Sequence, residues 1–507
     1  MGSEPGRGRN INRREFLHQS GATAAFLAAP FVGRRLALQP SAPQPPLTRA
    51  AVAPLAARLQ GEALLPGDAG YDAACRDWAG QLRLRPGVAV RCASARDVAT
   101  AVTFARERGL PLAVRSGGHA FRSTDGGVLV NLTGLTGVKV DARARVARVE
   151  AGLLLGDLDE ATEPFGLAAV LGECPSVGLA GYTLGGGLGR LMGRHGSASD
   201  NLVSADVVTA EGRVLHASAE ENVDLFWAIR GGGGNFGVLT SFEHRLHPVG
   251  QVLAGSLEYR IASARSTVRF FRDFMSDAPD ELDALIEMGS VLQYAPDARE
   301  PRIVINVCCG GPTQAAERTL RPLRAFGAPA RDTIRSMPYF QAQTLGANLA
   351  RLRTYLGPGY SRAARNGFVA RLTDSAIDVL VEHLEQPPST SWGVAFDHYL
   401  HGEVCRVPPA ATAFPLRHTG FSFRLVAFEA GTGPADRSAA WVRGLHGGLD
   451  RFSDGLMYLN YVTDQGEAGV RASLKGNYER LVGVKRRYDP TNFFRLNPNI
   501  APDTGSG

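Results

Sequence analysis

Hydrophobic residues in the first half of the chain recur with two different spacings. Short apolar runs at 88–92 and 112–118 have the length and β-branched content of strands. Between them, the apolar positions of residues 94–109 repeat at helical spacing, with Ser94 placed to cap the helix and Gly109 to end it. The pattern therefore predicts a strand, a helix and a second strand in succession.

The pattern continues with more strands up to about residue 249 and then changes. Three short runs within 128–150 are separated by turns, and residues 204–218 form a predicted hairpin around a Glu-Gly turn. Beyond residue 249, longer amphipathic stretches such as 375–386 stand beside alternating strands such as 419–430. This change predicts a second lobe that contains both helices and strands.

The length of 507 residues exceeds what one ordinary hydrophobic core holds, so we expect two domains after a leader. The predicted boundaries are 1–42 for a leader and linker, 50–248 for the first domain, 249–454 for the second, and 455–503 for a C-terminal segment. Within that last segment, Asp489-Pro490 is expected to end a helix.

Composition narrows the classes of protein that the chain can belong to. Hydrophobic residues make up 44% and charged residues 21%, a balance that excludes a disordered or fibrous chain. The net charge of +6 comes mostly from arginines in the first 40 residues, so it does not indicate a nucleic-acid partner. The six cysteines include no CxxC pair, so no zinc or dithiol site is predicted.

The leader combines Arg13-Arg14 with a short Ala-rich apolar stretch that ends near residue 33. This arrangement resembles a twin-arginine signal, and the stretch is shorter than the ~20 residues that span a bilayer. We therefore expect the twin-arginine export machinery as partner of the precursor, a periplasmic or secreted location, and no stable membrane anchor. The alternative is a disordered basic tail.

Glycine-rich segments carry the candidate chemistry. The first, Arg115-Ser116-Gly117-Gly118-His119, follows a predicted strand, and consecutive backbone N–H groups in such a turn can bind an anion such as a diphosphate. Taken alone, it could equally be a tight turn with a surface histidine.

Two further glycine-rich segments follow, at 172–189 and 224–238. Dense glycine lets a backbone lie against a flat ligand, and Cys174 stands at the edge of the second segment. Neither segment matches the phosphate-binding loop of nucleotide hydrolases or the dinucleotide fingerprint. A nicotinamide cofactor is therefore not favoured.

These three segments, in this order and together with the ending 488–494, resemble the berberine bridge enzyme-like family of FAD-linked oxidases, within the vanillyl-alcohol oxidase or PCMH-type superfamily. The resemblance implies an α+β fold with two lobes. One lobe is a PCMH-type FAD-binding domain formed by 50–248 and 455–503. The other, 249–454, is an α/β substrate-binding domain with an antiparallel sheet.

The resemblance also implies bicovalent FAD, with His119 bonded to the flavin 8α-methyl and Cys174 bonded to flavin C6. The cofactor-binding residues predicted in this way are His119, Cys174, Arg115, Ser116, Gly117, Gly118, Val177, Gly178, Gly181, Tyr182, Gly185, Gly186, Gly187, Gly189, Asn235, Gly237, Val238 and Asn497. Val177 matches the family position that lines the oxygen pocket, where valine accompanies fast reaction with O2. Plain packing of a branched side chain is the alternative.

The catalytic base is less well defined. Tyr458 and Tyr461 match the YxNY segment of the family, whose second tyrosine serves as base or substrate contact in some relatives. Since free tyrosine has a pKa near 10, Tyr461 would need a depressed pKa or concerted proton transfer. His398 is a second candidate, although either parity of its strand is possible. Leu188 replaces a tyrosine that some alcohol-oxidising plant relatives use.

These observations predict an oxidase that takes a hydride from an alcohol, sugar or related small molecule and reduces O2 to H2O2. The alternatives are an enzyme of secondary metabolism that closes rings or desaturates, a dehydrogenase with another acceptor, and a flavin-binding protein without turnover.

Overall fold

A computed structural model describes residues 46–77, 82, 84–119, 124–290, 292, 300–346, 360–388, 391–430, 436–462 and 466–502. The predicted leader, 1–42, lies outside these residues. Every helix among the described residues is too short or too polar to span a bilayer. The described residues belong to one compact unit, Pro45–Gly507.

The first lobe begins with a four-stranded sheet of order β1-β2-β4-β3, in which β4 pairs in parallel with both β2 and β3. All four residues of β4 are buried, and three of them are valine or leucine, as expected of a strand that is covered on both faces. Ser94 caps α4, as predicted, by accepting a hydrogen bond from Asp97 N. The bounds are β1 (Glu62–Leu64), β2 (Val88–Arg91), β3 (Leu112–Arg115), β4 (Val128–Asn131), α2 (Arg49–Ala56), α3 (Tyr71–Cys75) and α4 (Ala95–Glu107).

A five-stranded antiparallel sheet of order β5-β6-β10-β8-β9 completes this lobe, with a two-stranded ladder of β7 and β11 beside it. The predicted hairpin is confirmed as β8 and β9. The bounds are β5 (Val138–Asp141), β6 (Val146–Glu150), β7 (Leu167–Ala168), β8 (Leu202–Val208), β9 (Val214–Ser218), β10 (Val238–Arg245), β11 (His247–Pro248), α5 (Leu155–Thr162), α6 (Leu179–Leu184), α7 (Met192–His195) and α8 (Val223–Ile229).

The second lobe is built on a large antiparallel sheet of order β15-β12-β14-β13-β18-β19-β17, with β16 also paired to β12. The predicted α+β architecture with an antiparallel second sheet is thus confirmed. The bounds are β12 (Gln251–Arg260), β13 (Leu282–Gly289), β14 (Arg302–Cys309), β15 (Arg331–Asp332), β16 (Arg335–Pro338), β17 (Tyr360–Val369), β18 (Trp392–Leu400), β19 (Gly420–Ala430), α9 (Ala264–Ser276), α10 (Thr313–Ala325), α11 (Tyr339–Gln343), α13 (Asp374–Leu384), α14 (Glu403–Arg406) and α15 (Asp436–Asp450).

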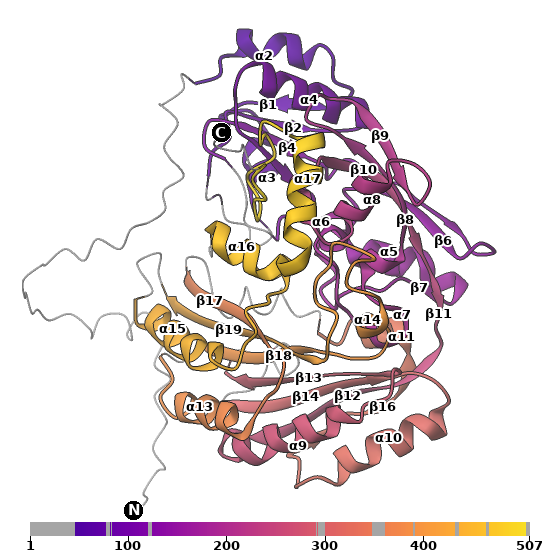
Figure 1. Ribbon diagram of the computed structural model, residues 1–507, viewed down its shortest axis with the longest axis vertical. Helices are drawn as coiled ribbons and strands as arrows, with labels where there is room; N and C mark the ends of the chain where they lie inside the picture. The colour runs from indigo at the N-terminus through magenta and orange to yellow at the C-terminus, as the bar shows by residue number, and fades with distance from the viewer. Residues whose placement is uncertain are drawn as a thin grey trace, which may run out of the picture. The chain divides into compact units, whose positions relative to one another are not determined.

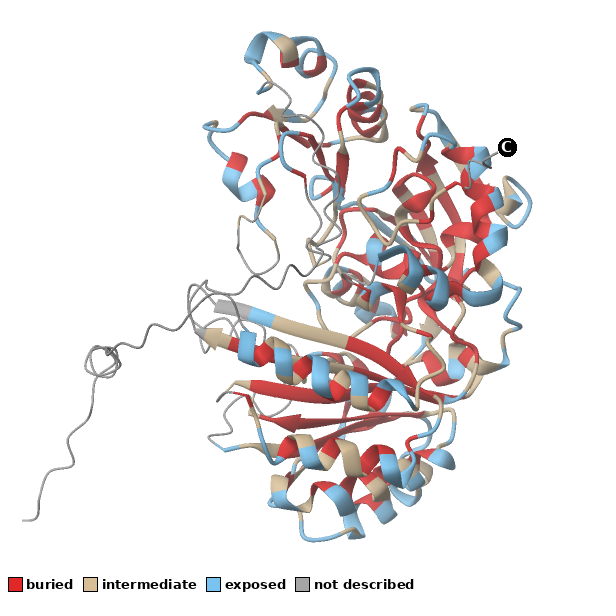
Figure 2. Ribbon diagram, turned by 60° about the vertical axis from the view of Figure 1, so that its left-hand side comes forward, coloured by how far each residue is buried: buried red, intermediate tan, exposed pale blue. Residues whose placement is uncertain are grey.

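The two faces of the large sheet differ in chemistry. One face packs with α9, α10, α13 and α15 into an apolar core that includes Phe271, Leu380 and Leu445 (Figure 1). The central strands β12, β13, β14 and β18 are buried along most of their length, whereas the covering helices alternate buried and exposed turns (Figure 2). Successive side chains of a strand point to opposite faces, so the other face receives residues such as Asp283 and Glu287. This polar face contacts the first lobe.

The C-terminal helices α16 (Gly466–Leu474) and α17 (Tyr478–Tyr488) pack into the core of the first lobe. Lys485 of α17 is fully buried, and its Nζ lies 2.6 Å from Asp489 Oδ2. The same ammonium donates to the carbonyl oxygens of Asn235, at 2.8 Å, and Phe494, at 3.0 Å. This one cation therefore joins the third glycine segment to the end of the chain.

Replacing Lys485 with methionine should lower the free energy of unfolding by about 3–5 kcal/mol, because Asp489 would be left as an unpaired buried charge. Urea denaturation followed by tryptophan fluorescence measures the change. The matched control is Arg471→Met, which removes the exposed pair with Glu479 and should cost under about 1 kcal/mol. Equal losses in the two variants would contradict this account of the buried pair.

Candidate active site

His119 and Cys174, from two different glycine segments, meet at one hydroxyl group. The Nε2 atom of His119 lies 3.0 Å from Ser176 Oγ, and Cys174 Sγ lies 3.5 Å from the same oxygen. The structure thus brings together the two residues that the sequence predicts as flavin attachment points. Ser176 was not among the residues predicted from the sequence, although it stands two positions after Cys174.

The backbones of these two segments touch at a pair of glycines. A Cβ atom on Gly117 would lie 2.2 Å from Gly178 N, and one on Gly178 would lie 2.3 Å from Gly117 N. No other residue fits at either position without moving a backbone. Ser116, beside this contact, donates to the carbonyl oxygen of Ala151 at 2.8 Å. Glycine at 117 and 178 therefore sets the separation of His119 and Cys174.

The glycine run at 185–189 is packed against the protein itself. A Cβ on Gly185 would lie 1.9 Å from Asn460 Oδ1, and one on Gly189 would lie 2.0 Å from the Leu171 carbonyl oxygen. Gly186 and Gly187 have positive φ and would meet Phe414 and Ala198 in the same way. Close packing thus accounts for these glycines, and their contact with a ligand stays a prediction. Gly181, by contrast, faces open space.

The third segment is tied to the C-terminal segment. Asn235 is fully buried, donates to the carbonyl of Pro498 at 3.0 Å and accepts from Ile500 N at 3.0 Å. The Asn235 side chain therefore joins two protein segments. The sequence predicted a cofactor contact at this residue and did not predict this structural role. Gly237, at the start of β10, leaves no room for a Cβ, which would lie 2.4 Å from Val207, and Val238 is a core residue.

Several polar atoms on these segments have no partner among the described residues. They are Arg115 Nε, Thr183 Oγ1 and Asn497 Oδ1, all of them buried. A buried polar atom without a partner costs about 1–3 kcal/mol, so such atoms are expected where a ligand completes them. Arg115 otherwise donates to the carbonyls of Ala73 and Ala74. The residues present therefore fit a polar cofactor such as FAD.

Tyr458 anchors the C-terminal segment to the second glycine segment. Its hydroxyl accepts hydrogen bonds from Leu188 N at 3.1 Å and from Asn460 Nδ2 at 2.8 Å. Asn460 also donates to the carbonyl of Tyr182, whose own hydroxyl donates to the carbonyl of Leu188. Burial raises the pKa of Tyr458 to about 12. These contacts make Tyr458 a positioning residue.

Tyr461 lies against Tyr458, with ring centroids 4.8 Å apart. Burial, followed by the negative charge of Asp397, raises the pKa of the Tyr461 phenol well above its usual value. Of the two routes expected from the sequence, the raised pKa favours concerted proton transfer. The phenol is neutral at physiological pH and can exchange its proton only in concert with a neighbouring group.

A β-bulge decides on which face of the sheet the His398 side chain lies. The pairing of β18 with β19 shifts register between Phe396 and His398, so Asp397 is the extra residue. Phe396 and Tyr399 pack on the helix-covered core, whereas Asp397 pairs with Arg424 and His398 contacts the Tyr458 ring edge-on at 6.4 Å. Burial lowers the pKa of His398, so its imidazole is neutral.

A buried charge cluster joins the two lobes and was missed in the sequence. Arg190, at the end of the second glycine segment, is fully buried and lies 3.0 Å from Glu173 and 3.2 Å from Asp283. Its Nη2 also donates to Asn306 Oδ1 at 2.9 Å. The sequence feature that could have revealed this cluster is a polar residue inside an apolar strand, as at Asp283 in β13. The cluster links the Cys174 segment to the polar face of the large sheet.

A second guanidinium belongs to the same cluster. Arg424 lies 3.2 Å from Asp397 and 4.0 Å from Glu287. Four carboxyl groups, including that of Glu173, thus share two guanidinium groups. Burial and the neighbouring carboxylates raise the pKa of Glu173 to about 8, although the positive charge of Arg190 opposes this shift.

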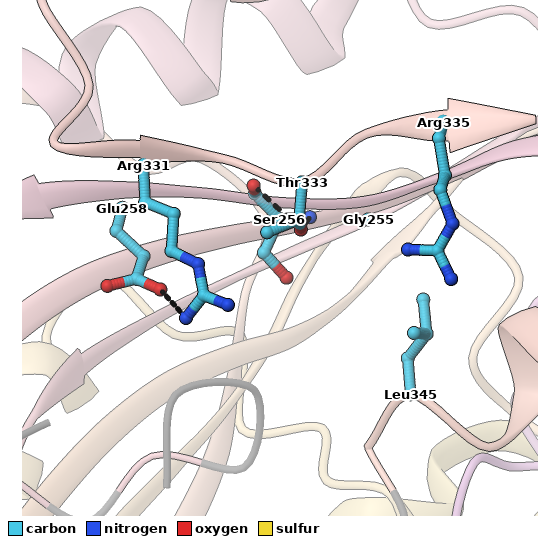
Figure 3. Close-up of a pocket in the computed structure, with 7 residues that line it drawn as sticks. All are labelled: Gly255, Ser256, Glu258, Arg331, Thr333, Arg335 and Leu345. Carbon is cyan, nitrogen blue, oxygen red and sulfur yellow. Dashed lines mark hydrogen bonds and ion pairs between the residues drawn. The ribbon is translucent and has the colours of Figure 1, made fainter. Parts of the chain in front are cut away.

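A separate pocket of about 210 Å³ lies where β12 pairs with β15 and β16 (Figure 3). Its lining includes Ser256, Glu258 and Arg331, the last two paired at 3.4 Å. The Ser256 hydroxyl accepts from Asn306 Nδ2, which connects the pocket to the Arg190 cluster. None of the residues predicted from the sequence lines it.

Comparisons with known proteins agree with the geometry. A family model described as FAD binding domain matches residues 86–218, and one described as berberine and berberine like matches residues 457–501. The chain is 32% identical to (R)-6-hydroxynicotine oxidase of Paenarthrobacter nicotinovorans over 460 residues, which cover 88% of this chain and 97% of that protein. The chain belongs to the berberine bridge enzyme-like family. This member is an FAD-dependent oxidoreductase.

Solved structures share the fold of this family member. The crystal structure of 6-hydroxy-D-nicotine oxidase from Arthrobacter nicotinovorans matches with a TM-score of 0.78 and 30% identity, covering 88% of this chain and 98% of that one. Glucooligosaccharide oxidase from Acremonium strictum, which carries 6-S-cysteinyl, 8α-N1-histidyl FAD, matches with a TM-score of 0.77 and 23% identity, covering 89% and 99%. The predicted family is therefore confirmed.

The raised pKa of Glu173 predicts how stability depends on pH. An unfolded glutamate titrates near 4.3, whereas this folded carboxyl titrates at about 8, so the folded state binds the extra proton between those values. Stability should therefore fall as pH rises through that window. Glu173→Gln should flatten the dependence, as measured by urea denaturation from pH 5 to 8.5. Exposed Glu479→Gln is the control, and parallel curves for wild type and Glu173→Gln would contradict the assignment.

Proposed function

We propose that this family member is a bicovalent FAD oxidase, with His119 bonded to the 8α carbon and Cys174 to C6 of the flavin. The contact of both residues with Ser176 is the observation that carries the proposal. The Acremonium relative, which carries a cysteinyl and a histidyl bond to one flavin, supports it. Orphaned polar atoms on the same segments support a cofactor of this polarity.

Bound FAD would supply two-electron chemistry, in which flavin N5 accepts a hydride and O2 is reduced to H2O2. Val177 lies between Cys174 and Gly178 and is partly buried against the core of the first lobe. Its modest size at this position supports access of O2 and therefore an oxidase rather than a dehydrogenase.

The proton of the donor has to leave as the hydride is transferred. Because the Tyr461 phenol is neutral, it accepts that proton only while giving its own to a neighbour. Asp397 is the charged group that raises its pKa most, and Asp397 Oδ2 is buried without a partner among the described residues. We infer that Tyr461 contacts the donor and that Asp397 receives the proton. Neutral His398 is the alternative acceptor.

The charge of the polar face narrows the donor class. Four carboxyl groups surround two guanidinium groups, and both guanidinium groups are already paired. An anionic donor would meet net negative charge, so alcohols and sugars without acidic groups are favoured. A basic amine is the second candidate, because negative charge favours it and the Paenarthrobacter relative is a 6-hydroxynicotine oxidase.

Intact mass of denatured variants tests the attachment. His119→Ala and Cys174→Ala should each keep the mass of FAD, since one bond remains, whereas the double variant should lose it on denaturation. Wild type that releases FAD when denatured would refute the bicovalent proposal and leave a non-covalent flavoprotein.

Tyr461→Phe should slow flavin reduction by about 10²–10⁴-fold, the usual contribution of a proton-transferring side chain. Stopped-flow absorbance under anaerobic conditions measures it, with the fastest donor from a panel of alcohols, sugars and amines. Reoxidation by O2 should be unchanged. Asp397→Asn should share the defect if Asp397 receives the proton, and His398→Gln should share it instead if His398 does. Full activity in Tyr461→Phe would remove Tyr461 from the mechanism.

A further inference from the structure

One hydroxyl group serves both predicted attachment residues. Ser176 Oγ lies 3.0 Å from His119 Nε2 and 3.5 Å from Cys174 Sγ, so it stands between an imidazole and a thiol from separate segments. A hydroxyl donates one hydrogen bond and accepts others, so it can accept from one of these groups while donating to the other. The neighbouring Ser116 cannot take this place, because its hydroxyl donates to the Ala151 carbonyl.

We propose that Ser176 is a positioning residue for covalent flavin attachment, accepting a hydrogen bond from His119 Nε2 and donating one to the Cys174 sulfur. This inference rests on the bicovalent attachment proposed above. The Ser176 hydroxyl would then orient both His119 and Cys174 for bond formation with the flavin. This role is separate from catalytic turnover.

For His119, the hydrogen bond selects the tautomer. A neutral imidazole carries one proton, and which nitrogen holds it depends on the hydrogen bond that the ring makes. With the proton on Nε2 and directed at Ser176, the lone pair lies on Nδ1. Nδ1 is then the atom that bonds the 8α carbon, while Nε2–H keeps its hydrogen bond to Ser176; the imidazolium formed in this step releases its proton to solvent.

For Cys174, the hydrogen bond favours the reactive thiolate. Burial raises the pKa of the Cys174 thiol, whereas contact with Ser176 and the positive charge of Arg424 lower it. The thiolate is the nucleophile, and a donor directed at sulfur stabilises it most where water is excluded. Loss of the hydroxyl should therefore make formation of the sulfur bond slower and shift it to higher pH.

The attachment steps balance with dioxygen as the oxidant. A new N–C bond replaces one C–H bond at the 8α carbon, and a new S–C bond replaces one C–H bond at C6. In each step the residue and the flavin lose one hydrogen each, as two protons and two electrons. One O2 takes up these two protons and two electrons and leaves as H2O2. Formation of the two bonds therefore consumes two O2.

The test measures covalent flavin by intact mass, during timed aerobic incubation of freshly purified protein with added FAD. Ser176→Ala is combined separately with Cys174→Ala, which leaves only the histidyl bond, and with His119→Ala, which leaves only the cysteinyl bond. Attachment should slow about tenfold in both backgrounds, the effect of losing one hydrogen bond to a reacting group. Ser176→Thr, which keeps the hydroxyl, should restore it.

A pH series separates this role from a structural one. In the His119→Ala background, Ser176→Ala should move the pH dependence of cysteinyl attachment upward, which a general loosening of the fold would not do. Ser218→Ala is the control for the effect of removing any serine hydroxyl. Ser218 lies at the end of β9, where its hydroxyl accepts from Glu220 N.

The outcomes separate this inference from the proposed function. Wild type with two bonds, together with Ser176→Ala variants that attach FAD at the parental rate and pH, would overturn the role of Ser176 and leave the bicovalent oxidase intact. Wild type that releases FAD would overturn the proposed function itself. Failure of Ser176→Thr to restore attachment would also count against the hydroxyl.

Discussion

The site depends on the backbone contact between Gly117 and Gly178. At this contact neither residue has room for a Cβ atom, so the two glycine segments pack main chain against main chain. His119 and Cys174 thereby reach the same Ser176 hydroxyl. Farther along the second glycine segment, Gly185 and Gly189 pack in the same close way against Asn460 and Leu171.

The polar face of the large sheet supplies the other half of the site. Arg190 crosses from the second glycine segment to Asp283 and Asn306, and it holds Glu173 beside Cys174. The Cys174 segment and the large sheet are therefore joined by a buried charge, whose loss leaves carboxylates without a partner. The bulge at Asp397 places two successive side chains of β18 on this face, beside both tyrosines.

The sequence predictions that agree best with the structure are those based on local pattern. The capped helix α4, the β8–β9 hairpin and the strands of the first sheet follow from apolar spacing and turn residues, and the structure confirms them. The resemblance supplied His119 and Cys174 as a pair. The bulge at Asp397 lies beyond such reasoning because it depends on pairing with β19. Contacts distant in sequence were missed for the same reason, as between Arg190 and Asp283 or between Gly185 and Asn460.

The joint attachment of one flavin to His119 and Cys174 is tested by peptide mapping of wild-type protein digested with trypsin after denaturation. Cleavage at arginine separates Ser116–Arg122, which contains His119, from Val149–Arg190, which contains Cys174. We expect one yellow species in which both peptides are joined through a single FAD. Flavin that elutes free, or that is bonded to a peptide containing neither residue, would contradict it.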